Sequence, residues 1–85
     1  MAVPTTLYSE DHERLVALLR HCRESAGLRQ VELAERLHRP QSFVSKYESG
    51  QRRLDLIELH TICGALGVDL VALVKSWAET PKQTP

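Results

Sequence analysis

The sequence lacks the features that are typical of disulfide-rich secreted domains and of membrane proteins. Its 85 residues include two cysteines, and its formal net charge at neutral pH is zero. Two cysteines do not make the disulfide framework of a small secreted domain. No apolar run approaches the ~18–20 residues of a membrane-spanning helix, and the first residues lack the basic and apolar segments of a secretory signal. We therefore expect a cytoplasmic protein with no membrane partner.

Metal and catalytic sites also lack support in the sequence. His60 and Cys63 are three residues apart in a predicted helix, but a zinc site needs four ligands and no second pair is evident. Both Cys22 and Cys63 fall within apolar helical patterns, which favours a place in the core. The four glycines are scattered and form no phosphate-binding loop. We expect no enzyme activity, no cofactor, no metal and no small-molecule ligand.

The distribution of charge is more informative than its sum. A net charge of zero argues against nucleic-acid binding, yet residues 28–53 contain six basic and only three acidic side chains. The flanking residues carry the compensating excess of acid. A basic middle segment is typical of a nucleic-acid-binding surface, although an ordinary solvated helix surface gives a similar bias.

Apolar residues recur at helical spacing along most of the chain. The spacing predicts five helices and no strand, at about residues 10–25, 30–37, 40–49, 56–66 and 70–77. Ser9 is expected to cap the first helix and Asp69 the fifth. Asp55 with Glu58 is expected to form a capping box on the fourth helix, and Pro40 to occupy the first turn of the third. The fold class is therefore all-α, with one domain over residues 9–78 and flexible ends at residues 1–8 and 79–85.

The apolar positions predict which faces are buried. In the first helix they are Leu15, Leu18, Leu19 and Cys22, and in the fourth they are Leu56, Leu59, Ile62, Cys63 and Leu66. The second and third helices, joined by residues 38–40, form a possible helix-turn-helix. Val44 and Tyr47 point inward, leaving four hydrogen-bonding side chains on the opposite face, as a helix in a major groove requires. Spacing alone does not distinguish this motif from any two packed helices.

Several short motifs, in a specific order, resemble a known family. They are Gln30 with Glu32-Leu33-Ala34, residues 42–46 (SFVSK), Glu48-Ser49-Gly50 followed by Arg52-Arg53, and Ala65-Leu66-Gly67-Val68. In this order they resemble the Cro/repressor-like (XRE-type) helix-turn-helix family of phage and bacterial regulators. The resemblance implies a five-helix, lambda-repressor-like domain that binds double-stranded DNA with its third helix.

The resemblance also implies roles for individual residues. It places four side chains against base edges: Gln41, Ser42, Ser45 and Lys46. It places three against DNA phosphates: Gln30, Arg52 and Arg53. Arg23 and Glu48 match an ion pair that ties the first helix to the recognition helix.

The sequence departs from the family pattern at four positions. His38 stands where the family often has glycine, so we expect some cost for a left-handed backbone there. Arg29 and Pro40 replace the usual Ser or Thr caps, so those caps should be weaker. Phe43 replaces a smaller polar residue, and it is either partly buried structure or a contact to a thymine methyl group.

The last predicted helix is more apolar than packing against a small bundle requires. An exposed apolar patch with an aromatic anchor is typical of an interface. We therefore expect a homodimer that uses Leu73, Val74 and Trp77 and that binds a near-palindromic operator.

The predicted function is a sequence-specific transcriptional regulator, a repressor or an autoregulator. The alternatives are a protein–protein adaptor of the same fold, or an antitoxin or restriction-modification controller that uses the same module.

Overall fold

The computed structural model describes residues 9–79, and within that range the chain forms five α-helices and no strand. The predicted all-α fold is confirmed. The helices are α1 (Glu10–Ser25), α2 (Gln30–Leu37), α3 (Gln41–Glu48), α4 (Leu56–Leu66) and α5 (Leu70–Glu79). The predicted flexible segments, residues 1–8 and the tail after residue 79, lie outside the described residues, and Glu79 itself belongs to α5.

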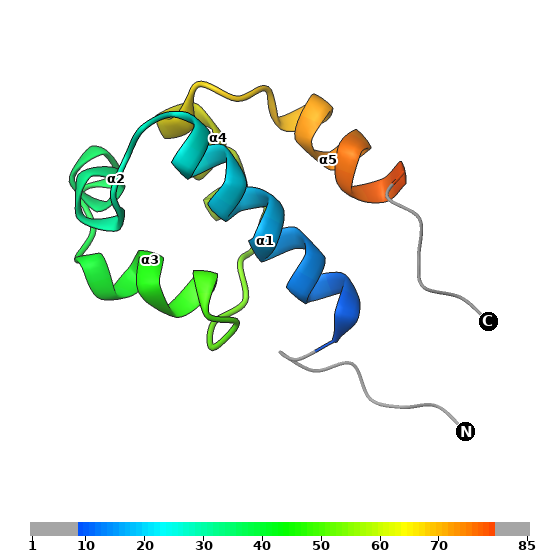
Figure 1. The fold of residues 1–85 in the computed structure, drawn as a ribbon, viewed down its shortest axis with the longest axis horizontal. Coiled ribbons are helices and arrows are strands. Elements are labelled where there is room, and N and C mark those ends of the chain that lie inside the picture. The colour runs from blue at the N-terminus through cyan, green and yellow to red at the C-terminus, as the bar shows by residue number, and fades with distance from the viewer. Residues whose placement is uncertain (1–8, 80–85) are drawn as a thin grey trace.

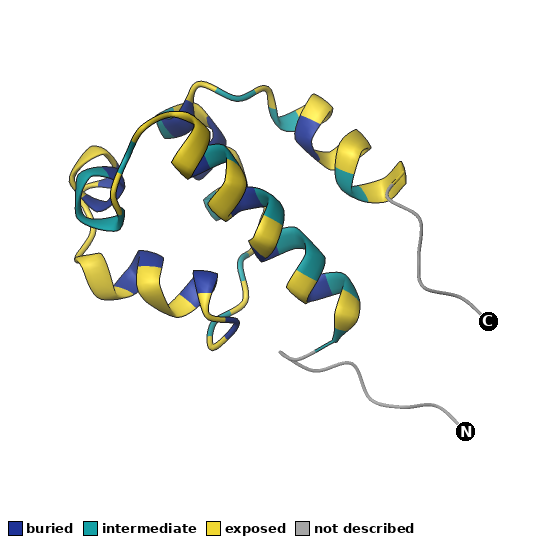
Figure 2. Ribbon diagram, in the orientation of Figure 1, coloured by how far each residue is buried: buried dark blue, intermediate teal, exposed yellow. Residues whose placement is uncertain are grey.

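Helix α1 runs through the middle of the molecule (Figure 1). It packs against α3 and α5, while α2 packs against α3 and α4, and α5 also contacts α4. Every helix contributes to one hydrophobic core, in which Leu19, Leu33, Val44 and Tyr47 are fully buried. Figure 2 shows buried residues on the faces that the helices turn toward one another. The side of α3 opposite its exposed face is therefore packed against α1 and α2.

Local side chains begin three of the helices as predicted. The Ser9 Oγ accepts a hydrogen bond from the His12 N–H, and the Asp69 carboxylate accepts one from the Ala72 N–H. Asp55 Oδ1 accepts from the Glu58 N–H at 2.7 Å, and Glu58 Oε1 accepts from the Asp55 N–H at 3.0 Å. This reciprocal pair satisfies two backbone donors at the start of α4.

The two helices of the helix-turn-helix begin without the side-chain cap that precedes the other three helices, although Glu32 Oε1 accepts from the Arg29 N–H at 2.7 Å at the start of α2. His38 ends α2 in the left-handed region, with φ 56° and ψ 41°, as expected. Neither Arg29 nor Pro40 makes a side-chain cap hydrogen bond. The prediction that Pro40 is helical was wrong. Its ψ of 155° is extended, so Pro40 is the residue before α3, which begins at Gln41 and ends at Glu48.

Burial differs from the periodicity-based prediction at several positions. Leu56 was expected in the core but is 66% exposed, and it is the first residue of α4. Three residues of α1 are buried and were not predicted to be: the apolar Val16 and the polar His12 and Arg23. Polar residues escape a search for apolar stripes, because that search ignores side chains buried with a partner.

Among residues 9–79, no single helix has the length and apolar composition to cross a membrane. Only α4 and α5 taken together reach that length, and they are bent by 110°.

Candidate DNA-binding surface

The α3 helix presents one polar face and one buried face. Four side chains are exposed on it, and these are the predicted base-reading residues Gln41, Ser42, Ser45 and Lys46. On the opposite face Val44 and Tyr47 are fully buried, and Phe43 is 8% exposed. Phe43 is therefore part of the packed interior. All four exposed side chains carry hydrogen-bonding groups able to reach base edges or phosphates.

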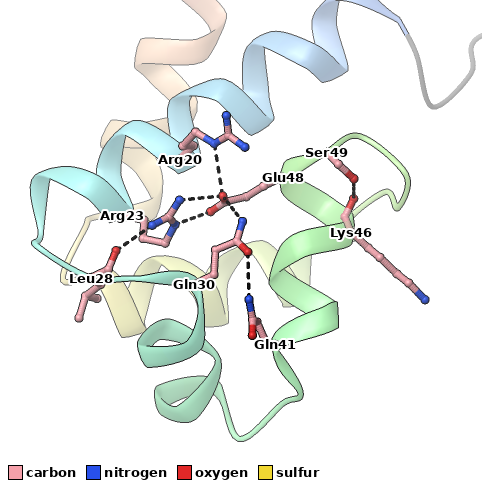
Figure 3. Close-up of polar contacts among 8 residues, drawn as sticks. All are labelled: Arg20, Arg23, Leu28, Gln30, Gln41, Lys46, Glu48 and Ser49. Atoms are coloured by element: carbon pink, nitrogen blue, oxygen red, sulfur yellow. Dashed lines mark hydrogen bonds and ion pairs between the residues drawn. The ribbon is translucent and has the colours of Figure 1, made fainter.

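Glu48 lies at the end of α3 and joins it to two other helices. Its Oε2 accepts from Arg23 Nε at 2.7 Å, and its Oε1 accepts from Arg23 Nη2 at 3.0 Å. The exposed fractions of the two side chains are 0% for Glu48 and 10% for Arg23. Arg23 also donates to the Leu28 carbonyl, and Arg20 approaches Glu48 Oε1 at 3.4 Å. The ion pair implied by the family resemblance is thus present, bidentate and buried (Figure 3).

The electrostatics of this pair favour its charged form. Burial by itself raises the pKa of the Glu48 carboxyl, but hydrogen bonds from Arg23 and Gln30 outweigh it and hold the pKa below its usual range. The hydrogen bond to Glu48 in turn raises the pKa of Arg23. The neighbouring Tyr47 hydroxyl is buried, and this burial raises its pKa. At neutral pH the network therefore contains a carboxylate and a guanidinium.

A hydrogen-bonded path runs from this ion pair to the start of α3. Gln30 Nε2 donates to Glu48 Oε1 at 3.0 Å, and Gln41 Nε2 approaches Gln30 Oε1 at 3.4 Å. Figure 3 shows the two amides in line between Glu48 and the first turn of α3, with Lys46 pointing away. A primary amide has two N–H donors, so Gln30 keeps a second donor besides the one given to Glu48. The orientation of Gln41 is thereby linked to the core.

The two predicted phosphate-binding arginines have different surroundings. Arg52 donates to both Glu58 oxygens, at 3.0 and 2.7 Å, and Arg53 is exposed. Arg53 instead borders a surface hollow with His12 and Trp77. Burial, followed by the charge of Arg53, lowers the pKa of His12. The hydrogen bonds from Arg52, with that from the Asp55 N–H, lower the pKa of Glu58 to about 2.

The residues predicted for a dimer interface do not share one exposed face. Leu73 is 3% exposed and belongs to the core of its own chain, so it does not lie on the surface expected to meet a partner. Trp77 is half-buried against α1, where its Nε1 donates to the Asp11 carbonyl and Arg14 lies over its ring. The large apolar residues exposed on α5 are Val71 and Val74.

Comparison with known proteins identifies the family. A model of the helix-turn-helix domain family matches residues 14–77. The chain is 49% identical to an XRE-family like protein from Pseudomonas syringae pv. tomato str. DC3000, covering 84% of this chain and 88% of that one with a TM-score of 0.78. The chain belongs to the XRE-type helix-turn-helix family. It is thus a DNA-binding transcription regulator by family, as the sequence motifs predicted.

Two further solved structures are similar. The clp gene regulator ClgR from Corynebacterium glutamicum is 26% identical, with a TM-score of 0.78 over 89% of this chain and 99% of that one. The restriction-modification controller protein C.Esp1396I is 22% identical, with a TM-score of 0.77 over 84% and 90% of the two chains, and shares the fold. No curated protein sequence matches the chain.

Sequence reasoning missed two residues that the structure places beside this surface. Arg39 precedes α3, and Glu58 bonds both Arg39 and Arg52. Glu58 was recognised only as a capping residue. Its second role depends on arginines that come near it in the fold, and no local pattern indicates that contact.

Proposed function

We propose that the protein is a sequence-specific transcriptional regulator, a repressor or an autoregulator, that inserts α3 into the major groove of an operator. Gln41, Ser42, Ser45 and Lys46 read the bases, while Gln30 and Arg52 contact phosphates, with Arg53 as a further backbone contact. Binding chromosomal DNA places this activity in the cytoplasm.

The observation that carries this proposal is the two-sided character of α3. A helix whose exposed face is entirely polar, and whose other face is packed without exposure, presents hydrogen-bonding groups at fixed positions. Base discrimination depends on such fixed geometry, because each bidentate contact distinguishes one base pair from the others. The path from Glu48 through Gln30 to Gln41 supplies that rigidity at the first turn.

The proposal is tested by DNA binding of the parent and of surface variants. A duplex selected by the parent from a random-sequence pool serves as the probe, with affinity measured by fluorescence anisotropy. Gln41→Ala or Lys46→Ala should weaken binding by about 1–3 kcal/mol and relax the preference at one or two base pairs. Lys75→Ala removes the same charge from α5 and should have little effect on base preference.

Two results would contradict the proposal. A parent that selects no duplex, and binds none in a salt-sensitive manner, favours the adaptor alternative, for which the zero net charge is the main support. Unchanged affinity and base preference in both variants would mean that α3 is not the recognition helix.

We also propose that the regulator acts as a homodimer through α5, in which the predicted Val74 is joined by Val71 in place of the buried Leu73. The side chains of Val71 and Val74 are 73% and 38% exposed, and their spacing of three residues puts them on one face of α5. Sedimentation of a Val71→Lys, Val74→Lys double variant should give a monomer where the parent gives a dimer. Ile57→Lys, which charges an exposed apolar position on α4, is the matched control. A parent that stays monomeric at high micromolar concentration would refute the stable dimer.

A further inference from the structure

Two arginines on either side of α3 share one aromatic ring and one carboxylate. Arg39 precedes the helix and Arg52 follows it, yet their Cζ atoms lie 4.2 and 4.9 Å from the centroid of the Phe43 ring. Their Nη2 atoms both donate to Glu58 Oε2, at 3.3 Å from Arg39 and 2.7 Å from Arg52. We call these four residues the Glu58 cluster.

The supports of the cluster are fixed, while its cations remain accessible. Glu58 accepts the Asp55 N–H at the start of α4, and Phe43 is 8% exposed within the core. The side chains of Arg39 and Arg52 are 43% and 38% exposed. A long side chain loses rotamer entropy when a ligand immobilises it. Because Glu58 and Phe43 already hold the two arginine side chains, part of this rotamer entropy is lost on folding and not on ligand binding.

The cluster keeps an excess of positive charge and unused donors. Two guanidinium groups and one carboxylate leave a net charge of one. Within the described part of the chain, the Arg39 side chain hydrogen-bonds through Nη2 alone, so its Nε–H and Nη1 hydrogens remain available. A planar guanidinium matches a phosphate group through two parallel hydrogen bonds. Arg39 stands two residues before Gln41, where base reading is proposed to begin.

We propose that Arg39 is a DNA-backbone contact, and that Phe43 and Glu58 are positioning residues that hold Arg39 and Arg52 as a pre-aligned pair for phosphate groups. The proposal rests on the proposed function, since it assumes that α3 enters DNA. In the competing explanation, the same contacts only tie α4 to α3 and do nothing for DNA.

The two explanations predict opposite signs for one substitution. Glu58 is an anion beside the proposed DNA surface, so removing its charge should strengthen binding if it acts only through charge. If Glu58 positions the arginines, Glu58→Gln should weaken binding several-fold, although the protein becomes more positive. Glu35→Gln is the matched control, because it removes an equal charge from an exposed position on α2. Both are measured against the duplex selected by the parent, and denaturation midpoints establish that each variant is folded.

Substitutions of Arg39 test the contact itself. Arg39→Ala should weaken binding about tenfold and lower the slope of log affinity against log salt by about 1 unit, the loss of one phosphate contact. Arg39→Lys keeps the charge and most of the salt slope but lacks the planar fork, so its affinity should lie between those of the parent and Arg39→Ala. Phe43→Leu keeps an apolar side chain and removes the ring, and it should resemble Arg39→Lys.

The possible outcomes separate this inference from the proposed function. Weaker binding by Glu58→Gln together with a reduced salt slope for Arg39→Ala supports the cluster. If the parent binds and Gln41→Ala weakens it, but Glu58→Gln binds as tightly as Glu35→Gln and Arg39→Ala keeps the parent's slope, the inference is overturned and the function stands. If the parent binds no DNA, both are overturned.

Discussion

Two carboxylates of this protein each gather a pair of arginines, and their burial differs. Glu48 has a fully buried side chain and bonds Arg23 and Arg20, whereas Glu58 is 19% exposed and bonds Arg39 and Arg52. Glu48 takes a third donor from Gln30, and Glu58 takes one from the backbone of Asp55. The chemistry is alike, but only the Arg23–Glu48 ion pair is removed from water; the side chains of Arg20, Arg39 and Arg52 are 52%, 43% and 38% exposed.

Because of this difference in burial, the same kind of ion pair has different roles in the two clusters. A buried charge without its partner is strongly destabilising, whereas an exposed pair contributes little because water and salt screen it. The Glu48 network therefore fixes the position of α3 in the bundle. The Glu58 cluster leaves its arginines accessible to a ligand, at a small cost to the fold.

The largest effect is expected from Glu48→Gln. The substitution leaves Arg23 almost buried without a counter-charge, so the free energy of unfolding should fall by about 3–5 kcal/mol. Urea denaturation followed by circular dichroism measures the change, with Glu35→Gln as an exposed control on α2. An unchanged urea midpoint would show that the pair contributes nothing to stability in solution.

A smaller effect is expected from acid. The pKa of Glu48 is lower in the folded chain than in the unfolded one, so its contribution is complete above about pH 5 and is lost as the pH falls through the folded pKa. His12, whose pKa is also lowered, adds a loss of stability as the pH falls below its usual value.

Urea midpoints measured at a series of pH values test this assignment. The parent should lose stability both where His12 protonates in the unfolded chain and again in the carboxylate range. The Glu48→Gln variant should keep the first loss and show a reduced second one. An identical acid dependence of the two proteins would assign the second loss to other carboxylates.

The smallest change in stability is expected from Glu58→Gln. The glutamine keeps an acceptor for the Asp55 N–H, so the capping box is retained and only partly exposed ion pairs are lost. The urea midpoint should move much less than in Glu48→Gln, and added salt should reduce the difference from the parent. A shift equal to that of Glu48→Gln would contradict the distinction between the two clusters.

The sequence by itself determined the helices and most of their ends. Helical periodicity and the caps at Ser9, Asp55 and Asp69 depend on neighbours within about one turn, so the linear sequence contains them. The left-handed conformation of His38 was implied by the family resemblance. The polar face of α3 follows from the same spacing. The family resemblance supplied the partnership of Arg23 and Glu48, which lie 25 residues apart.

Only the tertiary structure decided which side chains meet across helices and which apolar residues remain exposed. Periodicity gave α5 an apolar face, but the packing of α5 on α1 and α4 buries Leu73 and leaves Val71 in solvent. Arg39 and Glu58, 19 residues apart, meet because α4 begins beside the turn that precedes α3. Such contacts depend on how helices cross, and the crossing is set by the fit of the whole core rather than by any segment alone.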